Sequence, residues 1–236
     1  MSPEVGREEL QRASWLAGTL GLLTAVTLGI AVFTPPLSGP WCTGGCFPYP
    51  YEGIASRFPR DYFWMMPAML VSVGFVALLI SVHRCAPAST RSFSLLGLAL
   101  GGFGAFALLL DYWVQVAVIQ PSVLRGEHDG IALLSQFNPH GVFIAIEELG
   151  FLSMSVGLAC LAPVFWGLRA PGRKVAWVVL AGAVSSFGAL VGTSMRFGLQ
   201  REYFLEVALI SVVWLTLIIV GPMLALLFRR QARSLG

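Results

Sequence analysis

The chain has 236 residues, of which 56% are hydrophobic and only 11% are charged, and its formal net charge is +3. Soluble domains carry about 25% charged residues, so a water-exposed surface of this composition would be largely apolar and prone to aggregation. The composition therefore excludes an ordinary soluble domain. The lack of a basic run with interleaved aromatic residues argues against a nucleic-acid partner.

Several apolar stretches are long enough to cross a bilayer, whose hydrocarbon core needs about 20 residues of helix. We place these spans at about 14–34, 62–82, 93–120, 139–168, 176–198 and 203–228. Proline and glycine mark most of the breaks between them. The sequence predicts an all-α integral membrane protein, a bundle of about six transmembrane helices that forms a single domain over residues 1–236 and has the lipid bilayer as its partner.

The basic residues lie mainly on one side of this arrangement. The richer set of segments includes both ends of the chain and contains Arg7, Arg12, Arg84, Arg91, Arg169, Arg173, Lys174, Arg229, Arg230 and Arg233. The poorer set contains Arg57, Arg60, Arg125, Arg196 and Arg201. Because cytoplasmic loops carry an excess of Lys and Arg, we expect both termini to be cytoplasmic.

The first outer loop contains Cys42 and Cys46, with Gly44 and Gly45 between them. In an oxidising compartment the two thiols are expected to form a small disulfide, and the glycines permit the tight ring. A metal site is an alternative, but no His is nearby to complete it. A redox-active pair is another, although thioredoxin-like motifs have a two-residue spacing.

The third span carries Asp111 and Gln115, which are four residues apart and therefore share one face of a helix. Gly97, Gly101 and Gly104 fall on the same face, and small residues allow neighbouring helices to approach closely. We therefore expect Asp111 and Gln115 to point into the bundle. At the rise of an α-helix, Asp111 lies about 14 Å below the outer end of its span.

The segment between the third and fourth spans has an apolar part, Ile131–Leu134 and Phe137, among polar neighbours. This pattern predicts a short interfacial segment that caps the polar side of the bundle. Asn138 is a favourable N-cap and Pro139 suits the first helical position, so we expect the fourth helix to begin there.

Two acids, Glu147 and Glu148, lie in the fourth span about 12–14 Å below Pro139, which matches the depth of Asp111. His140 and Glu147 share a face, whereas Glu148 lies about 100° further round the helix. The two acids are therefore expected to serve different neighbours.

The fifth span ends at Arg196 and the sixth begins with Glu206 near its outer end. The helical face assigned to Arg196 carries small residues, namely Gly182, Ser185, Ala189 and Gly192. We therefore expect Arg196 to point inward as a counter-ion for the acids.

Charged side chains within a membrane cost about 2.5–3.5 kcal/mol each on insertion scales, and here several gather at one depth. Arg196 is expected to neutralise one acid and another to retain a proton, which would allow proton exchange or hydrogen bonding to a ligand. The alternative is a buried polar network that only fixes the packing of the helices.

Five short segments resemble a family of uncharacterised bacterial six-helix polytopic membrane proteins. They are Asp111–Gln115, Gln120–Ser122, Asn138–Gly141, Glu147–Gly150 and Arg201–Phe204. The resemblance covers most of the chain. It implies a bacterial cytoplasmic membrane and no particular activity.

Three functions fit these patterns. The leading one is an outward-side polar pocket for a small molecule, lipid or ion, in a proton-coupled carrier, using Asp111, Gln115, His140, Glu147, Glu148, Arg196 and Glu206. The second is a membrane enzyme acting on a lipid or isoprenoid through carboxyl and His acid–base chemistry. The third is a non-catalytic accessory or assembly protein. The sequence contains no nucleotide-binding loop, zinc-hydrolase motif or nucleophile elbow, so we predict no cofactor and no metal.

Overall fold

The computed structural model describes residues 5–34 and 36–235, and these residues form helices and loops without a strand. Six helical segments are long and apolar enough to cross a membrane. Their main helices are α1 (Arg7–Val32), α2 (Met65–Cys85), α3 (Arg91–Val114), α6 (Val142–Ala159), α8 (Gly172–Phe197) and α9 (Tyr203–Ser234). The predicted fold class is therefore confirmed.

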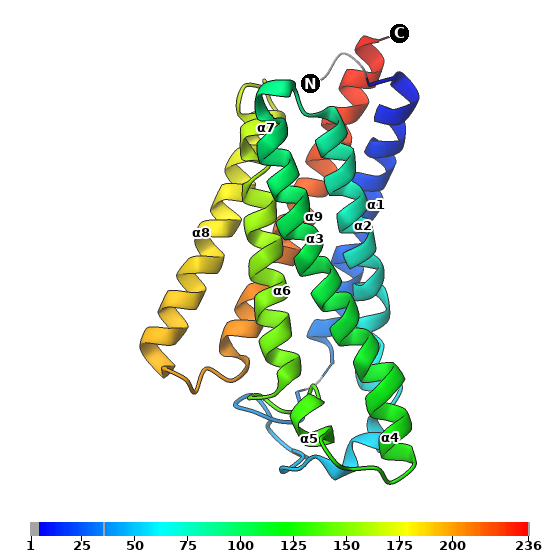
Figure 1. Cartoon of the computed structure of the whole chain (residues 1–236), viewed down its shortest axis with the longest axis vertical. Helices are drawn as coiled ribbons and strands as arrows, with labels where there is room; N and C mark the ends of the chain where they lie inside the picture. Colours follow the sequence, from blue (N-terminus) through cyan, green and yellow to red (C-terminus); the bar gives the residue numbers. More distant parts are fainter. Residues whose placement is uncertain (1–4, 35, 236) are drawn as a thin grey trace.

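These six helices form a closed ring in which each packs against its neighbours. The order around the ring is α1, α2, α3, α6, α8 and α9, and α9 returns to α1. A further contact between α6 and α9 crosses the interior. Figure 1 places both ends of the described chain at one end of the bundle. We call this the inner end, and the opposite end, with the long loops, the outer end.

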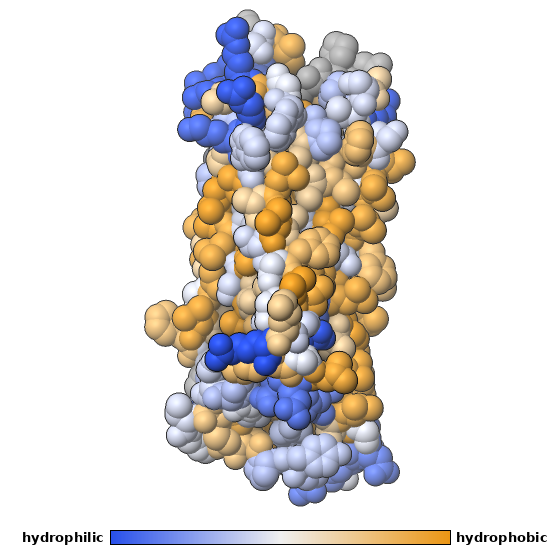
Figure 2. All heavy atoms as spheres, turned by 90° about the vertical axis from the view of Figure 1, so that its left-hand side faces the viewer, coloured by the Kyte–Doolittle hydropathy of each residue, from blue (hydrophilic) through white to orange (hydrophobic). Residues whose placement is uncertain are grey.

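The surface between the two ends is apolar. Large hydrophobic side chains such as Leu70, Phe106 and Val184 are exposed on three different helices. Figure 2 shows an orange, hydrophobic belt between two polar ends on the face that it presents. Because such a belt is stable in lipid and not in water, the chain is a multi-pass membrane protein.

Glycine residues bring the helices of the ring into close contact. A Cβ atom added to Gly97 on α3 would lie 2.7 Å from the carbonyl oxygen of Gly157 on α6. In the contact between α1 and α9, a Cβ on Gly221 of α9 would lie 2.7 Å from the carbonyl oxygen of Ala17 on α1. The glycine face predicted for the third span therefore packs against α6, as the small residues indicated.

Short helices complete the connections and extend three of the spans. Three 3₁₀-helices lie in the loops: η1 (Glu52–Arg57), η2 (Arg60–Tyr62) and η3 (Ala88–Thr90). The third span continues through a π-helix, η4 (Gln115–Ile119), into α4 (Gln120–Leu124). The remaining short helices are α5 (Ile131–Leu134) and α7 (Ala162–Trp166).

The start of the fourth span differs from the sequence prediction. The helix begins at Val142 after Gly141, and Asn138 does not cap it. Instead, the Asn138 side chain accepts a hydrogen bond from the His140 N–H at 3.0 Å and donates one to the Ala132 carbonyl at 2.8 Å. Asn138 therefore stabilises the turn that joins α5 to α6, a local alternative to capping that Asn side chains adopt readily.

Candidate functional site

A cavity of about 420 Å³ opens at the outer end of the bundle. Its walls come from the outer ends of α1 and α9, the starts of α2 and α6, and two loops that cover them. Five aromatic side chains line it, namely Trp41, Trp64, Phe137, Phe143 and Tyr203. We call this space the outer cavity.

Two acidic side chains line the outer cavity, and their surroundings differ. Asp61 is held by Arg57 at 2.8 Å and by Arg60 at 2.6 Å, so its charge is compensated. Glu206 is 8% exposed and has no ion-pair partner among the described residues. Glu206 is therefore the uncompensated acid in the cavity wall.

Glu206 connects the outer cavity to a second buried acid, Glu147. The two carboxyl groups lie within hydrogen-bonding reach of each other. The other oxygen of Glu147, Oε1, accepts a hydrogen bond from the Tyr112 hydroxyl at 2.6 Å. No N–H or O–H of the described residues donates to Glu147 Oε2. A hydrogen bond between the two carboxyls requires that one of them carry a proton.

Asp111 is the third member of this group. It is 3% exposed, it lies close enough to Glu147 and Glu206 for their charges to interact, and its Oδ2 atom has no hydrogen-bond partner among the described residues. We call Asp111, Glu147 and Glu206 the acidic cluster. Among the described residues, no Lys or Arg lies within ion-pair distance of any of the three. The depth match inferred from the sequence concerned Asp111, Glu147 and Glu148, and it did not include Glu206.

Glu148 faces a different neighbour from Glu147, as predicted. Its carboxylate pairs with Arg201 at 2.9 Å, and Arg201 also reaches the Ser194 hydroxyl at 3.4 Å. This half-buried ion pair joins α6 to the loop between α8 and α9. It lies outside the lining of the outer cavity.

Arg196 does not point into the bundle, so its expected role as the counter-ion is corrected. Its guanidinium is exposed and lies 5.3 Å from the centre of the Phe197 ring. The buried positions of α8 end at Ser186, and beyond it the helix diverges from its neighbours (Figure 1). The inward face also differs from the predicted one, because Ser186 accepts a hydrogen bond from Ser155 while Ser185 is exposed.

Gln115 and His140 are placed away from the outer cavity. The Gln115 amide donates to the Leu134 carbonyl at 2.7 Å and accepts from the Gln136 N–H at 3.0 Å. It therefore fastens the loop that covers the cavity. His140 is exposed and contributes nothing to the cavity lining.

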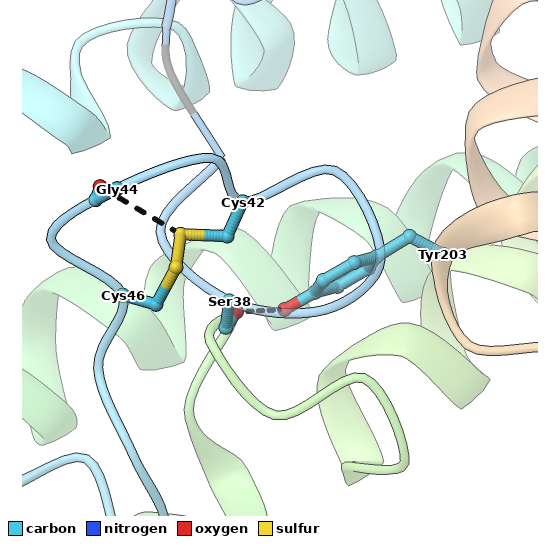
Figure 3. Close-up of a disulfide and its surroundings, with 5 residues drawn as sticks. All are labelled: Ser38, Cys42, Gly44, Cys46 and Tyr203. Atoms are coloured by element: carbon cyan, nitrogen blue, oxygen red, sulfur yellow. Dashed lines mark hydrogen bonds between the residues drawn. A yellow bond between two sulfur atoms is a disulfide. The ribbon is translucent and has the colours of Figure 1, made fainter.

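The loop that carries the disulfide forms part of the cavity roof. Cys42 and Cys46 are bonded, with their Cα atoms 5.9 Å apart, which confirms the predicted pairing (Figure 3). In the same loop, Ser38 hydrogen-bonds the Tyr203 hydroxyl at 2.7 Å. Tyr203 itself donates to the Gln136 carbonyl at 3.0 Å. One tyrosine at the start of α9 thus ties together both loops that cover the cavity.

The chain beyond the disulfide folds back towards the same helix end. Tyr51 is buried there and adopts a left-handed backbone conformation with φ of 67°. Burial raises the pKa of Tyr51, and the nearby Tyr49 and Glu202 raise it further. Its hydroxyl is therefore uncharged at neutral pH.

Three residues with clear roles in this geometry were not identified from the sequence. Tyr112 follows Asp111 directly, and a buried tyrosine hydroxyl needs an acceptor, which is a usable signal. Trp64 packs against Tyr112 with ring centres 5.2 Å apart and so links the cavity wall to the acidic cluster. No sequence pattern indicated the ion pair of Arg201, because its partner depends on how the α8–α9 loop folds.

No family model matches the chain, and no curated protein and no solved structure matches it. The fold and the site are therefore interpreted from their own geometry. In the described part of the chain, no three His, Cys, Asp or Glu side chains are placed to share a metal ion. The arrangement consists of an aromatic cavity, an uncompensated acid in its wall and a second acid behind it.

Proposed function

We propose that the protein binds a small organic cation with an apolar body in the outer cavity, with the cationic group against Glu206. One observation carries this proposal: the cavity wall contains a buried acid, joined to a second acid, and neither has a cationic partner in the described chain. A buried charge needs a partner or a proton, because leaving it unpaired in a low-dielectric interior is costly.

The lining of the outer cavity supports the same class of ligand. Aromatic faces attract cations, by up to about 2 kcal/mol where the site is desolvated, and aromatic cages recognise quaternary ammonium groups. Trp41, Trp64 and Tyr203 are aromatic residues of the same cavity lining as Glu206. The volume of about 420 Å³ falls within the range of small-molecule sites, about 300–1,000 Å³.

The acidic cluster links cation binding to a proton. Two adjacent carboxylates in a desolvated site repel each other, so in the empty protein one proton is shared by Glu147 and Glu206. An arriving cation supplies the positive charge instead and displaces that proton. Binding of the cation and release of a proton are then coupled.

The outer cavity also has an opening towards the membrane. Val32 at the end of α1 and Val207 on α9 both line the cavity, and they are 70% and 40% exposed. Both residues lie where the apolar belt meets the outer end. An amphipathic cation dissolved in the outer leaflet can therefore enter from the side as well as from the water.

Two extensions of this proposal are separable by experiment. A proton-coupled carrier would need an inward route, and the close glycine contacts of the inner half disfavour one without helix separation. A lipid-modifying enzyme is favoured by one specific feature, the chain of hydrogen-bonding groups from Tyr112 through Glu147 to Glu206. Such a chain can deliver a proton to a substrate. Conversion of an added lipid would identify the enzyme, and binding without conversion would favour the proposal.

We also propose a bacterial plasma membrane with both termini in the cytoplasm. Two independent features support this orientation. The inner end carries the Lys- and Arg-rich segments that favour the cytoplasmic side. The outer end carries the Cys42–Cys46 disulfide, and disulfides persist in oxidising compartments outside the cytoplasm.

The proposal is tested with a matched pair of probes on the purified full chain in a non-ionic detergent. The probes are benzyltrimethylammonium and its neutral isostere neopentylbenzene, and the readout is the thermal unfolding temperature. We expect the cation to raise this temperature and the isostere to have little effect. Glu206→Gln should weaken cation binding at least tenfold, in line with the roughly 2–5 kcal/mol attributed to buried charge pairs.

Glu202→Gln is the control variant, because Glu202 lies four residues away and outside the cavity lining. It should bind the cation as the natural chain does. Glu206→Gln should itself remain folded, since it removes repulsion within the carboxyl pair. Equal binding of the cation by Glu206→Gln, or equal stabilisation by the neutral isostere, would contradict the proposal.

A further inference from the structure

A second cavity lies at the inner end, on the surface between α1 and α9. Its volume is about 770 Å³. The side of α1 contributes Arg7, Gln11 and Trp15, and the side of α9 contributes Arg229 and Arg233. We call this space the arginine groove. Nothing in the proposed function uses it.

The helical spacing explains why these side chains converge. Arg7, Gln11 and Trp15 are four residues apart in turn, and so are Arg229 and Arg233, so each set forms one stripe along its helix. On α1 the lining continues from Arg7 to Leu22, a length of roughly 22 Å at the rise of an α-helix. The groove therefore begins at the polar end of the bundle and runs into the apolar belt.

Within the described part of the chain, no acid compensates the arginines of the groove. Arg7, Arg229 and Arg233 form no ion pair with a described residue, and no acidic side chain lines the groove. Other arginines at this end are paired: Arg84 with Glu9 at 2.7 Å and Arg12 with Glu8 at 3.6 Å. The groove therefore has a local excess of positive charge, which calls for an anion.

The deeper part of the groove is narrow and closed at its floor by small residues. The Ser14 hydroxyl donates to the Ala225 carbonyl at 2.8 Å, which satisfies both groups. A Cβ on Gly18 would lie 3.6 Å from the Ala225 side chain, so the two helices nearly touch there. Leu22 adds an apolar wall beyond them. This part of the groove suits a hydrocarbon chain and offers little to a free anion.

We propose that the arginine groove binds an anionic phospholipid of the surrounding leaflet. The phosphate lies between Arg7, Arg229 and Arg233, and an acyl chain follows the floor towards Leu22. Guanidinium groups bind phosphate oxygens through paired hydrogen bonds, and basic pockets between membrane helices are suited to anionic headgroups. Trp15, which is 77% exposed, lies at the level where tryptophan side chains contact lipid headgroups.

The test uses native mass spectrometry of the full chain in detergent, with added phosphatidylglycerol or phosphatidylcholine. We expect retained phosphatidylglycerol on the natural chain and little phosphatidylcholine. The double variant Arg229→Gln with Arg233→Gln should weaken phosphatidylglycerol binding on the order of tenfold, because each basic residue near the surface contributes to the attraction. The matched control is Arg173→Gln with Lys174→Gln, which removes the same charge from the inner end outside the groove.

The control should retain phosphatidylglycerol as the natural chain does. Equal losses in both double variants would overturn the proposal, because they would show a general charge effect. Competition by soluble glycerol phosphate at the same concentration would also overturn it, because the ligand would then be a free phosphate. A dimer that is present in the natural chain and absent only in the groove variant would also overturn the proposal, because the groove would then bind a second copy of the chain.

Discussion

In the outer half of the bundle, Glu206 and Glu147 are neighbours next to a cavity of about 420 Å³, and no Lys or Arg among the described residues pairs with either acid. In the inner half, Gly97 and Gly157 bring two helices together so closely that a single methyl group would not fit. The outer half thus contains buried groups that are not satisfied and space that is not filled. Among the described residues, the helices of the inner half pack closely against one another and carry almost no buried charge, and the arginine groove lies on the surface of that half.

This difference separates stability from function within one bundle. Close packing of small residues is the main source of helix association in lipid, where no hydrophobic force operates between helices. Unpaired buried acids oppose stability, so proteins keep them where a ligand or a proton completes them. We therefore assign the stability of the bundle to the glycine contacts, and binding to the acidic cluster and the outer cavity.

The largest expected effect is on the close-packed half. Gly97→Ala places a Cβ 2.7 Å from the Gly157 carbonyl oxygen, and overpacking of this kind costs about 1–3 kcal/mol. The free energy of unfolding, measured by denaturant titration in detergent, should fall by that amount. Gly102→Ala is the control on the same helix, because nothing lies within 4 Å of its added Cβ. Similar losses in both variants would refute the assignment.

A smaller effect is expected at the junction of the two halves. Tyr112→Phe removes the hydroxyl that donates to Glu147 at 2.6 Å, and hydrogen bonds to charged groups contribute about 1.5–3 kcal/mol. Because a shared proton reduces the charge on Glu147, we expect the lower end of this range in the free energy of unfolding. Tyr49→Phe, at an exposed tyrosine, should change it little. A Tyr112→Phe variant as stable as the natural chain would show that the hydroxyl adds nothing.

The smallest effect is expected in the roof of the outer cavity, on affinity for benzyltrimethylammonium. Gly39→Ala places a Cβ 2.5 Å from the Tyr203 ring, and displacing that ring should weaken binding by about 1 kcal/mol, roughly fivefold. Gly45→Ala is the matched control, because its φ of 67° is nearly the 68° of Gly39 while its Cβ meets nothing within 4 Å. Equal affinities of the two variants would show that the roof of the outer cavity does not contribute to cation binding.

The sequence predicted the parts of this molecule that depend on local pattern. Hydropathy located the six spans, and helical spacing placed Asp111 on the glycine face of α3. Counting the rise along two antiparallel helices matched the depth of Asp111 with that of Glu147. The apolar residues Ile131–Leu134 predicted a short interfacial segment, and the structure forms the helix α5 there. Each of these inferences depends on the sequence of a single helix or loop, or on one pair of neighbouring helices.

The parts that depend on packing of distant elements were not predicted. Arg196 was expected to face inward because its face carries small residues, but α8 diverges from the bundle beyond Ser186. Small residues pack closely only where a partner helix is present. The sequence of α8 does not indicate how far along the helix a partner is in contact. An outward-side pocket was predicted, but the loops that cover the outer cavity were not, since Tyr203 joins loops far apart in the chain.

The most direct test of the central claim is the number of protons released when benzyltrimethylammonium binds. It is measured by isothermal titration calorimetry of the full chain at pH 7 in two buffers of different ionisation enthalpy. We expect release of protons, approaching one for each cation bound. Glu206→Gln should lose both the binding and the proton release, and Glu202→Gln should retain both. Binding without proton release, or release that survives Glu206→Gln, would contradict the assignment of the acidic cluster as a proton-linked cation site.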